Sequence, residues 1–170
     1  MMKPLPAPLP VLFVFLLLVI VTPSRLLAHN PGLSSAHIQV FDDRIELSVT
    51  LPSEDAGWFM AWLTETRKLE KGGEIQENAA VIAHELGGLF LGNTRIKPRS
   101  SLLLPPIEPG ELSVTVTFDH PGRKTIEYRA GCFEALPRGH FQLVVAIQNL
   151  DTLAEAILDR ANTTLGIPLE

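Results

Sequence analysis

Alternation of apolar and polar residues is the feature that most restricts the fold of this chain. It runs through Ile45–Leu51 and Leu112–Asp119, and in Phe141–Ile147 the larger apolar residues again occupy every second position. A period of two is typical of β-strands that bury one face and expose the other to water. Because Asp42 and Asp43 favour a tight turn just before the first segment, Ile38–Leu51 is predicted to be a β-hairpin.

Shorter segments of the same kind complete the pattern. Ser101–Leu104, Ile126–Tyr128 and Thr163–Ile167 are predicted strands, while Leu153–Leu158 fits either a strand or a helix. Several short strands in one small domain predict a mainly β fold, an antiparallel β-sandwich.

The alternation also predicts which side chains enter the core. The larger apolar residues of two strands are expected to point inward: Val114, Val116, Phe118, Leu143, Val145 and Ile147. Their polar neighbours are expected to face water: Thr115, Thr117 and Gln142.

A two-helix insertion is predicted after the first hairpin, over about residues 53–91. The expected helices are Glu54–Glu70 and Glu74–Leu91, because apolar residues recur there at helical spacing. The first helix carries an apolar face made of Trp58, Phe59, Trp62 and Leu63. We expect this face to pack on the second helix or on the sheet. The alternative is an exposed docking surface for a membrane partner.

The amino-terminal segment predicts export. Lys3 precedes an unbroken apolar run, Val11–Val21, and Ala28 supplies a small residue at the expected cleavage point. The run is shorter than the roughly 20 residues that a membrane-spanning helix needs. Residues 1–28 are therefore predicted to be a signal peptide. Residues 29–170 are predicted to form a single extracytoplasmic domain, periplasmic or secreted. The alternative is a leader that is retained as an anchor.

Charge and cysteine content narrow the partners. Without residues 1–28 the chain has 12 basic and 19 acidic residues, a net charge of −7. An acidic chain without a basic stretch argues against nucleic acid and anionic lipid as partners, and we expect no direct membrane span after cleavage. Cys132 is the only cysteine, so it is either a buried apolar residue or a site of pairing between chains.

Catalytic motifs fail on inspection. His84-Glu85 suggests a zinc protease helix, but that motif requires a second histidine at position 88, which is Gly88. No serine lies in a Gly-x-Ser-x-Gly turn, and Cys132 has no activating partner in the sequence. We therefore expect a protein that is not an enzyme.

Histidines offer one candidate metal site. Cleavage after Ala28 would make His29 the first residue, so that its amine and its imidazole could chelate one ion. His37 and His140 are the candidates for a third nitrogen, and such a donor set suits copper or nickel. The alternative is that His29, His37 and His140 are ordinary polar residues.

Two stretches together resemble a known family. One is His29–Ser35 followed by the hairpin end Leu47–Leu51; the other is Ile126–Arg129 with Cys132-Phe133, Leu136-Pro137 and Gly139-His140. They are similar to the exported amino-terminal region of HupE/UreJ-type hydrogenase and urease accessory membrane proteins. The resemblance implies a non-catalytic extracytoplasmic domain, here without the family's membrane domain, that acts with a separate polytopic membrane protein.

Three functions fit these features of the sequence. The first is this accessory domain, and the second is a periplasmic copper- or nickel-binding protein that uses His29. The third is a structural or interaction module unrelated to metal. Relatives with a calcium-loop-like segment differ from this chain, because Glu70–Glu74 lacks alternating aspartate or asparagine ligands.

Overall fold

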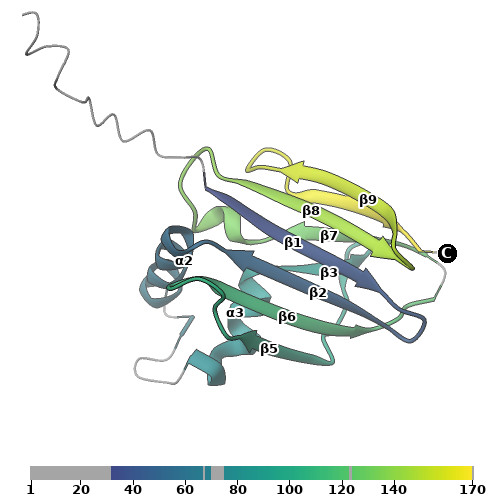
Figure 1. The fold of residues 1–170 in the computed structure, drawn as a ribbon, viewed down its shortest axis with the longest axis horizontal. Coiled ribbons are helices and arrows are strands. Elements are labelled where there is room, and N and C mark those ends of the chain that lie inside the picture. Colours follow the sequence, from purple (N-terminus) through teal and green to yellow (C-terminus); the bar gives the residue numbers. More distant parts are fainter. Residues whose placement is uncertain (1–31, 67, 70–74, 123, 170) are drawn as a thin grey trace, which may run out of the picture. The chain divides into compact units, whose positions relative to one another are not determined.

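Two β-sheets stacked face to face form most of the described structure (Figure 1). The computed structural model describes residues 32–66, 68–69, 75–122 and 124–169, which fall in the compact unit Pro31–Glu170. The predicted signal peptide and His29 lie outside the described residues.

Sheet A has six strands. In spatial order these are β5 (Ser100–Leu104), β6 (Leu112–Asp119), β2 (Arg44–Leu51), β1 (Leu33–Val40), β8 (Phe141–Gln148) and β9 (Asp151–Leu158). All neighbours are antiparallel except β1 and β8, which run parallel. Because a long crossover separates β1 from β8, it can return the chain in the same direction, which a short hairpin cannot do. Sheet A is thus mixed and not purely antiparallel as predicted.

Sheet B has four antiparallel strands. Their order is β10 (Thr164–Pro168), β7 (Thr125–Ala130), β3 (Gly87–Leu91) and β4 (Thr94–Arg95). The predicted mainly β, sandwich-like fold is therefore confirmed. Of the two assignments considered for Leu153–Leu158, the strand is correct.

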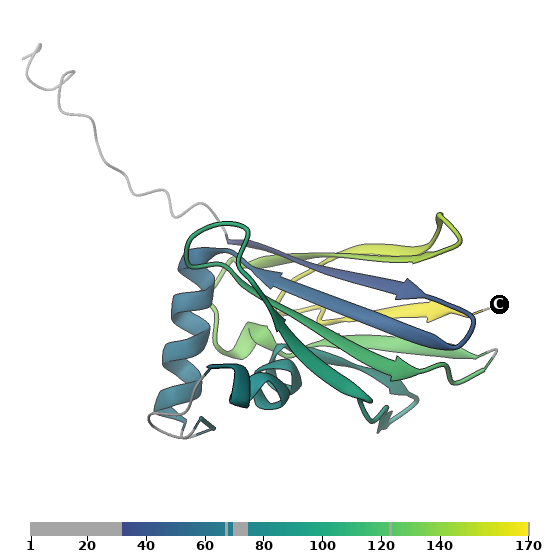
Figure 2. The ribbon, with the colours of Figure 1, turned by 60° about the horizontal axis from the view of Figure 1, so that its bottom comes forward.

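The helices are shorter than predicted. α2 (Ser53–Glu65) lies at one end of the two sheets, and α3 (Ala79–Leu86) follows the 3₁₀ turn η1 (Ile75–Asn78) and packs on β5 and β6 (Figure 2). The chain changes directly from helix to strand at Gly87, so the helical segment ends before the predicted residue 91. A Cβ atom at Gly87 would lie only 2.9 Å from the Tyr128 hydroxyl, so this crossing point requires glycine. None of the described helices is long and apolar enough to cross a bilayer.

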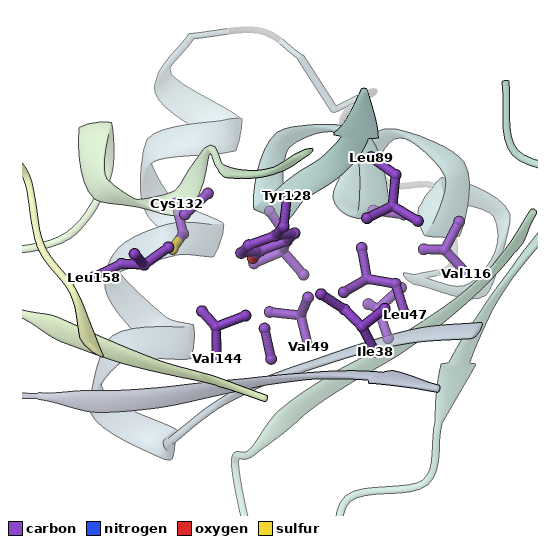
Figure 3. Close-up of a cluster of buried hydrophobic side chains, with 14 of the residues drawn as sticks. Ile38, Leu47, Val49, Leu89, Val116, Tyr128, Cys132, Val144 and Leu158 are labelled. Atoms are coloured by element: carbon purple, nitrogen blue, oxygen red, sulfur yellow. The ribbon is translucent and has the colours of Figure 1, made fainter. Parts of the chain in front are cut away.

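The core lies between the sheets around one buried aromatic residue. Figure 3 shows the Tyr128 ring at the centre, with Val49 and Val144 of sheet A below it and Cys132 beside it. Two of the four predicted apolar residues of α2, Phe59 and Leu63, are completely buried. Trp58 is 51% exposed, so the aromatic face of α2 packs only in part.

The predicted faces are correct for β6 and wrong for β8. Val114, Val116 and Phe118 are buried as expected. On β8 the inward residues are Gln142, Val144 and Ala146, whereas the larger residues predicted for the core lie on the other face: Leu143, Val145 and Ile147. The physical reason is a buried polar partner. The Gln142 side chain accepts a 2.9 Å hydrogen bond from the Tyr128 hydroxyl, which needs such a partner inside the core.

Candidate functional site

The β8–β9 apolar surface occupies one half of the outer face of sheet A. It is defined by six residues that share this face: Leu33, Phe141, Leu143, Val145, Ile147 and Ile157. Leu33, Phe141 and Ile157 are 57%, 37% and 65% exposed, and the other three are half-buried. The pairing register places Leu33 beside Phe141, and Leu143 beside Ile157, so the patch is continuous across β1, β8 and β9.

The other half of the same face is polar and internally bonded on β2 and β6, although its edge strand β5 exposes two apolar side chains, Leu102 and Leu104. Across β2 and β6, the hydroxyls of Ser48 and Thr115 lie 2.9 Å apart, and those of Thr50 and Ser113 lie 2.5 Å apart. Cross-strand hydroxyl pairs of this kind are a usual way to finish a face of a sheet that meets water. The apolar half has no such arrangement, which sets it apart as a surface suited to a partner.

No described part of the chain covers this surface. Sheet B and α3 lie on the inner side of sheet A, and α2 lies at the end of the two sheets, as the two ribbon views agree (Figures 1 and 2). Exposed apolar residues scattered singly are normal, but a contiguous group on an open sheet face marks an interaction site more often.

The surface reaches a free edge at β9. Sheet A ends at this strand, and within the described residues β9 pairs only with β8. Glu155 lies on the outer face of β9, in register with Val145 of β8, and is exposed. The described residues include no ion-pair partner for Glu155.

A second candidate is a buried polar cluster at the opposite face of sheet A. The Ser34 hydroxyl at the start of β1 lies 2.9 Å from His140 Nε2, just before β8. His140 Nδ1 lies 3.4 Å from Asp55 Oδ2 in the first turn of α2, without the alignment of a hydrogen bond. Burial raises the pKa of Asp55 and lowers the pKa of His140, while the attraction between the two groups opposes both shifts.

The backbone at Gly32 lies directly against Asp55 and His140 of this cluster. A Cβ atom at Gly32 would lie 2.5 Å from Asp55 Oδ1 and 2.6 Å from His140 Nδ1. Only glycine therefore allows the chain to pass so close to the pair. The serine, histidine and carboxylate follow the order of a nucleophile, a base and an orienting acid. However, Ser34 is only 1% exposed, so the arrangement serves to join the starts of β1, α2 and β8.

The predicted metal ligands are not brought together. His29 lies outside the described residues. His37 is exposed on the outer face of β1, whereas His140 is buried beneath the inner face. In the described part of the chain, no three histidine, cysteine, aspartate or glutamate side chains converge as metal ligands. The copper or nickel site thus stays a prediction.

Sequence reasoning missed the residues that matter most here. From the sequence, Asp55 is expected to stabilise the first turn of a helix through its negative charge. Its position in the sequence gives no indication that it is buried beside His140. The β8–β9 apolar surface was missed because its residues were assigned to the core. The apolar residues on both faces of β8 were the available signal, since Val144 and Ala146 interleave with the larger side chains.

Comparison with known proteins adds no family assignment. Neither the protein-family models nor the curated proteins give a match to this chain.

Proposed function

We propose that this chain is an exported, non-catalytic binding domain that acts with a separate polytopic membrane protein. The observation that carries the proposal is the β8–β9 apolar surface, because it is contiguous, built from large side chains and covered by none of the described residues. On this proposal the domain works like the extracytoplasmic part of HupE/UreJ-type accessory proteins.

The energetics favour a partner at this surface. Removing apolar surface from water contributes about 25 cal/mol for each Å², so covering several large side chains supplies several kcal/mol to binding. The polar half of the same face gains nothing comparable, since its hydroxyls already bond to each other. A partner is therefore expected to sit over β8 and β9 and to leave β2 and β6 in water.

Two features of the sequence support the membrane location of the partner. The apolar run Val11–Val21 followed by Ala28 favours export, and the stretches His29–Ser35 and Ile126–His140 resemble those of the accessory family. The acidic charge disfavours direct attachment to anionic lipid, so contact with a membrane protein is the proposed route.

A photo-crosslinking experiment in the native host tests this function. p-Benzoylphenylalanine placed at Ile157 is expected to form an adduct with an integral membrane protein of several spans. The same probe at Thr117, in the polar half of the face, is the control and is expected to form none. Adducts only with a second copy of this chain, or no adduct from positions 143, 145 and 157, would contradict the proposal.

A further inference from the structure

We propose that β9 is an acceptor strand: an extended segment of the partner protein pairs with its free edge and carries an apolar and a basic residue two positions apart. The inference rests on the proposed binding function and specifies how the partner is recognised. It follows from the edge, the charge and the apolar surface taken together.

The backbone of β9 supplies the first part of the site. An edge strand presents N–H and C=O groups that are ready to pair with another chain. The register between β8 and β9 is interrupted at one point: Ala146 pairs with Ala154, but the next residue, Ile147, pairs with Thr152. Leu153 is therefore left without a partner in β8. This bulge at Leu153 interrupts the regular edge, so the acceptor segment is Ala154–Leu158.

The side chains of this segment define the partner's chemistry. Glu155 and Ile157 both lie on the outer face, because they pair with Val145 and Leu143. In an added strand, the residues opposite them lie on that same face, two positions apart. An apolar residue opposite Ile157 extends the β8–β9 apolar surface, and a basic residue opposite Glu155 neutralises a carboxylate that has no ion pair among the described residues.

A second copy of this chain fits the edge poorly. Antiparallel pairing of two β9 strands centred on the acceptor segment would place the two Glu155 carboxylates opposite or diagonal to each other. Like charges in these positions are destabilising. Asp151, at the other end of β9, adds a further negative charge to the same strand. The charge therefore favours a basic segment from a different protein.

The other sheet edges offer less. α3 packs on β5, although Leu102 and Leu104 of that strand are exposed; β4 has only two residues, and β10 contacts β9 without pairing with it. Within the described residues, β9 is the edge strand that adjoins the β8–β9 apolar surface and carries an exposed carboxylate, Glu155, without an ion pair.

Two matched peptides test the acceptor strand. The probes are nine-residue synthetic peptides of alternating Thr and Val with a central Ile-Thr-Lys, or with Ile-Thr-Glu in its place. The purified protein is expected to bind the lysine peptide about threefold to tenfold more tightly in low salt, from the cross-strand charge energies. The preference is expected to shrink as salt is added.

Charge reversal on the protein gives the decisive comparison. Glu155→Lys is expected to reverse the preference between the peptides, while Glu108→Lys, which makes the same charge change in the exposed β5–β6 loop, is expected to preserve it. Amide exchange of Ala154–Leu158 is expected to slow in the complex, because an added strand bonds the β9 backbone.

The outcomes separate this inference from the function on which it rests. Equal binding of both peptides, no binding of either at millimolar concentration, or unchanged exchange in β9 would overturn the acceptor strand. If the crosslink from position 157 to a membrane protein nevertheless forms, the proposed binding function stands, but the partner binds in a way other than by adding a strand to β9. If the peptides behave as expected but no membrane protein is captured, the partner assignment fails and the acceptor strand stands.

Discussion

Strands β6 and β8 have the same length and lie in the same sheet, yet they use their two faces in opposite ways. β6 buries Val114, Val116 and Phe118 and turns its hydroxyl residues outward, where they bond across to β2. β8 buries its amide and smaller apolar side chains, Gln142, Val144 and Ala146, and turns its larger residues outward. A strand that places larger apolar residues on its partly exposed outer face than in the core contributes to something besides the core of its own domain.

The inner face of β8 is explained by its neighbours. Tyr128 fills the space opposite β8, so the strand has room there for small residues and one hydrogen-bonding amide (Figure 3). Gln142 also directs its Nε2 toward the Cys132 sulfur at 3.8 Å. The size of each inner residue of β8 thus fits the side chains that pack against it. The outer residues of β8 have no sheet or helix of the described chain packed over them.

The largest expected effect separates the two faces of β8 directly. Val144→Asp would bury an unpaired carboxylate and is expected to cost about 3 to 5 kcal/mol of the unfolding free energy, enough to unfold many small domains. Val145→Asp, on the outer face, is expected to cost only about 1 kcal/mol, chiefly through repulsion from Glu155. Urea denaturation followed by circular dichroism measures both variants. Equal losses would show that the two faces of β8 do not differ as described.

The close approach at Gly32 gives the next largest effect. Gly32→Ala places a methyl group against Asp55 and His140 and is expected to cost about 2 kcal/mol by overpacking. Gly57→Ala is the matched control, because a Cβ atom there meets nothing within 4 Å, and it is expected to stabilise α2 by about 0.5 to 1 kcal/mol. Thermal melting of the two variants in opposite directions is the expected result. A neutral Gly32→Ala would mean that the cluster opens readily.

A smaller effect tests the polar contact that fixes the inner face of β8. Tyr128→Phe leaves the Gln142 carbonyl oxygen without its partner and is expected to cost about 1 to 2 kcal/mol. In a double-mutant cycle with Gln142→Leu, the two losses are expected to be non-additive by about 1 kcal/mol. Additive losses would show that the hydrogen bond does not hold β8 in its register.

The smallest expected effect is on the chemical reactivity of the Cys132 thiol, which lies on the inner side of sheet A beside Gln142. Burial raises the pKa of Cys132 to about 12, so the nucleophilic thiolate is scarce at pH 8. The native protein is expected to react with a thiol reagent only on the timescale of unfolding, whereas the protein in urea reacts at once. Rapid labelling of the native protein would place Cys132 in a more open environment than that beside Gln142.

Sequence patterns predicted the elements better than their orientation. The β1–β2 hairpin and the face of β6 follow from alternation alone, because only one side of each carries large apolar residues. β8 is apolar on both sides, so periodicity could not decide which side enters the core. At Gly87 the apolar stripe of α3 continues into β3 without interruption, and only the close approach to Tyr128 and Arg129 shows why the residue at this change from helix to strand is glycine.

The candidate sites were less accessible to sequence reasoning than the fold. Asp55 and Ser34 meet His140 through tertiary structure, from segments that share no motif. The proposed acceptor segment Ala154–Leu158 is visible only once β9 is known to end sheet A. Edge position is a property of strand order, which no local pattern encodes.

The parallel pairing of β1 with β8 has a consequence for when the chain can fold. Ser34 and His140, which meet at the start of this pair, are 106 residues apart. A chain that leaves a translocation channel amino terminus first would present β1 long before its parallel neighbour exists. Proteins dominated by such distant pairings fold slowly, on timescales of milliseconds to seconds. If the chain is exported as proposed, β1 cannot pair with β8 until Phe141–Gln148 has also passed through the membrane.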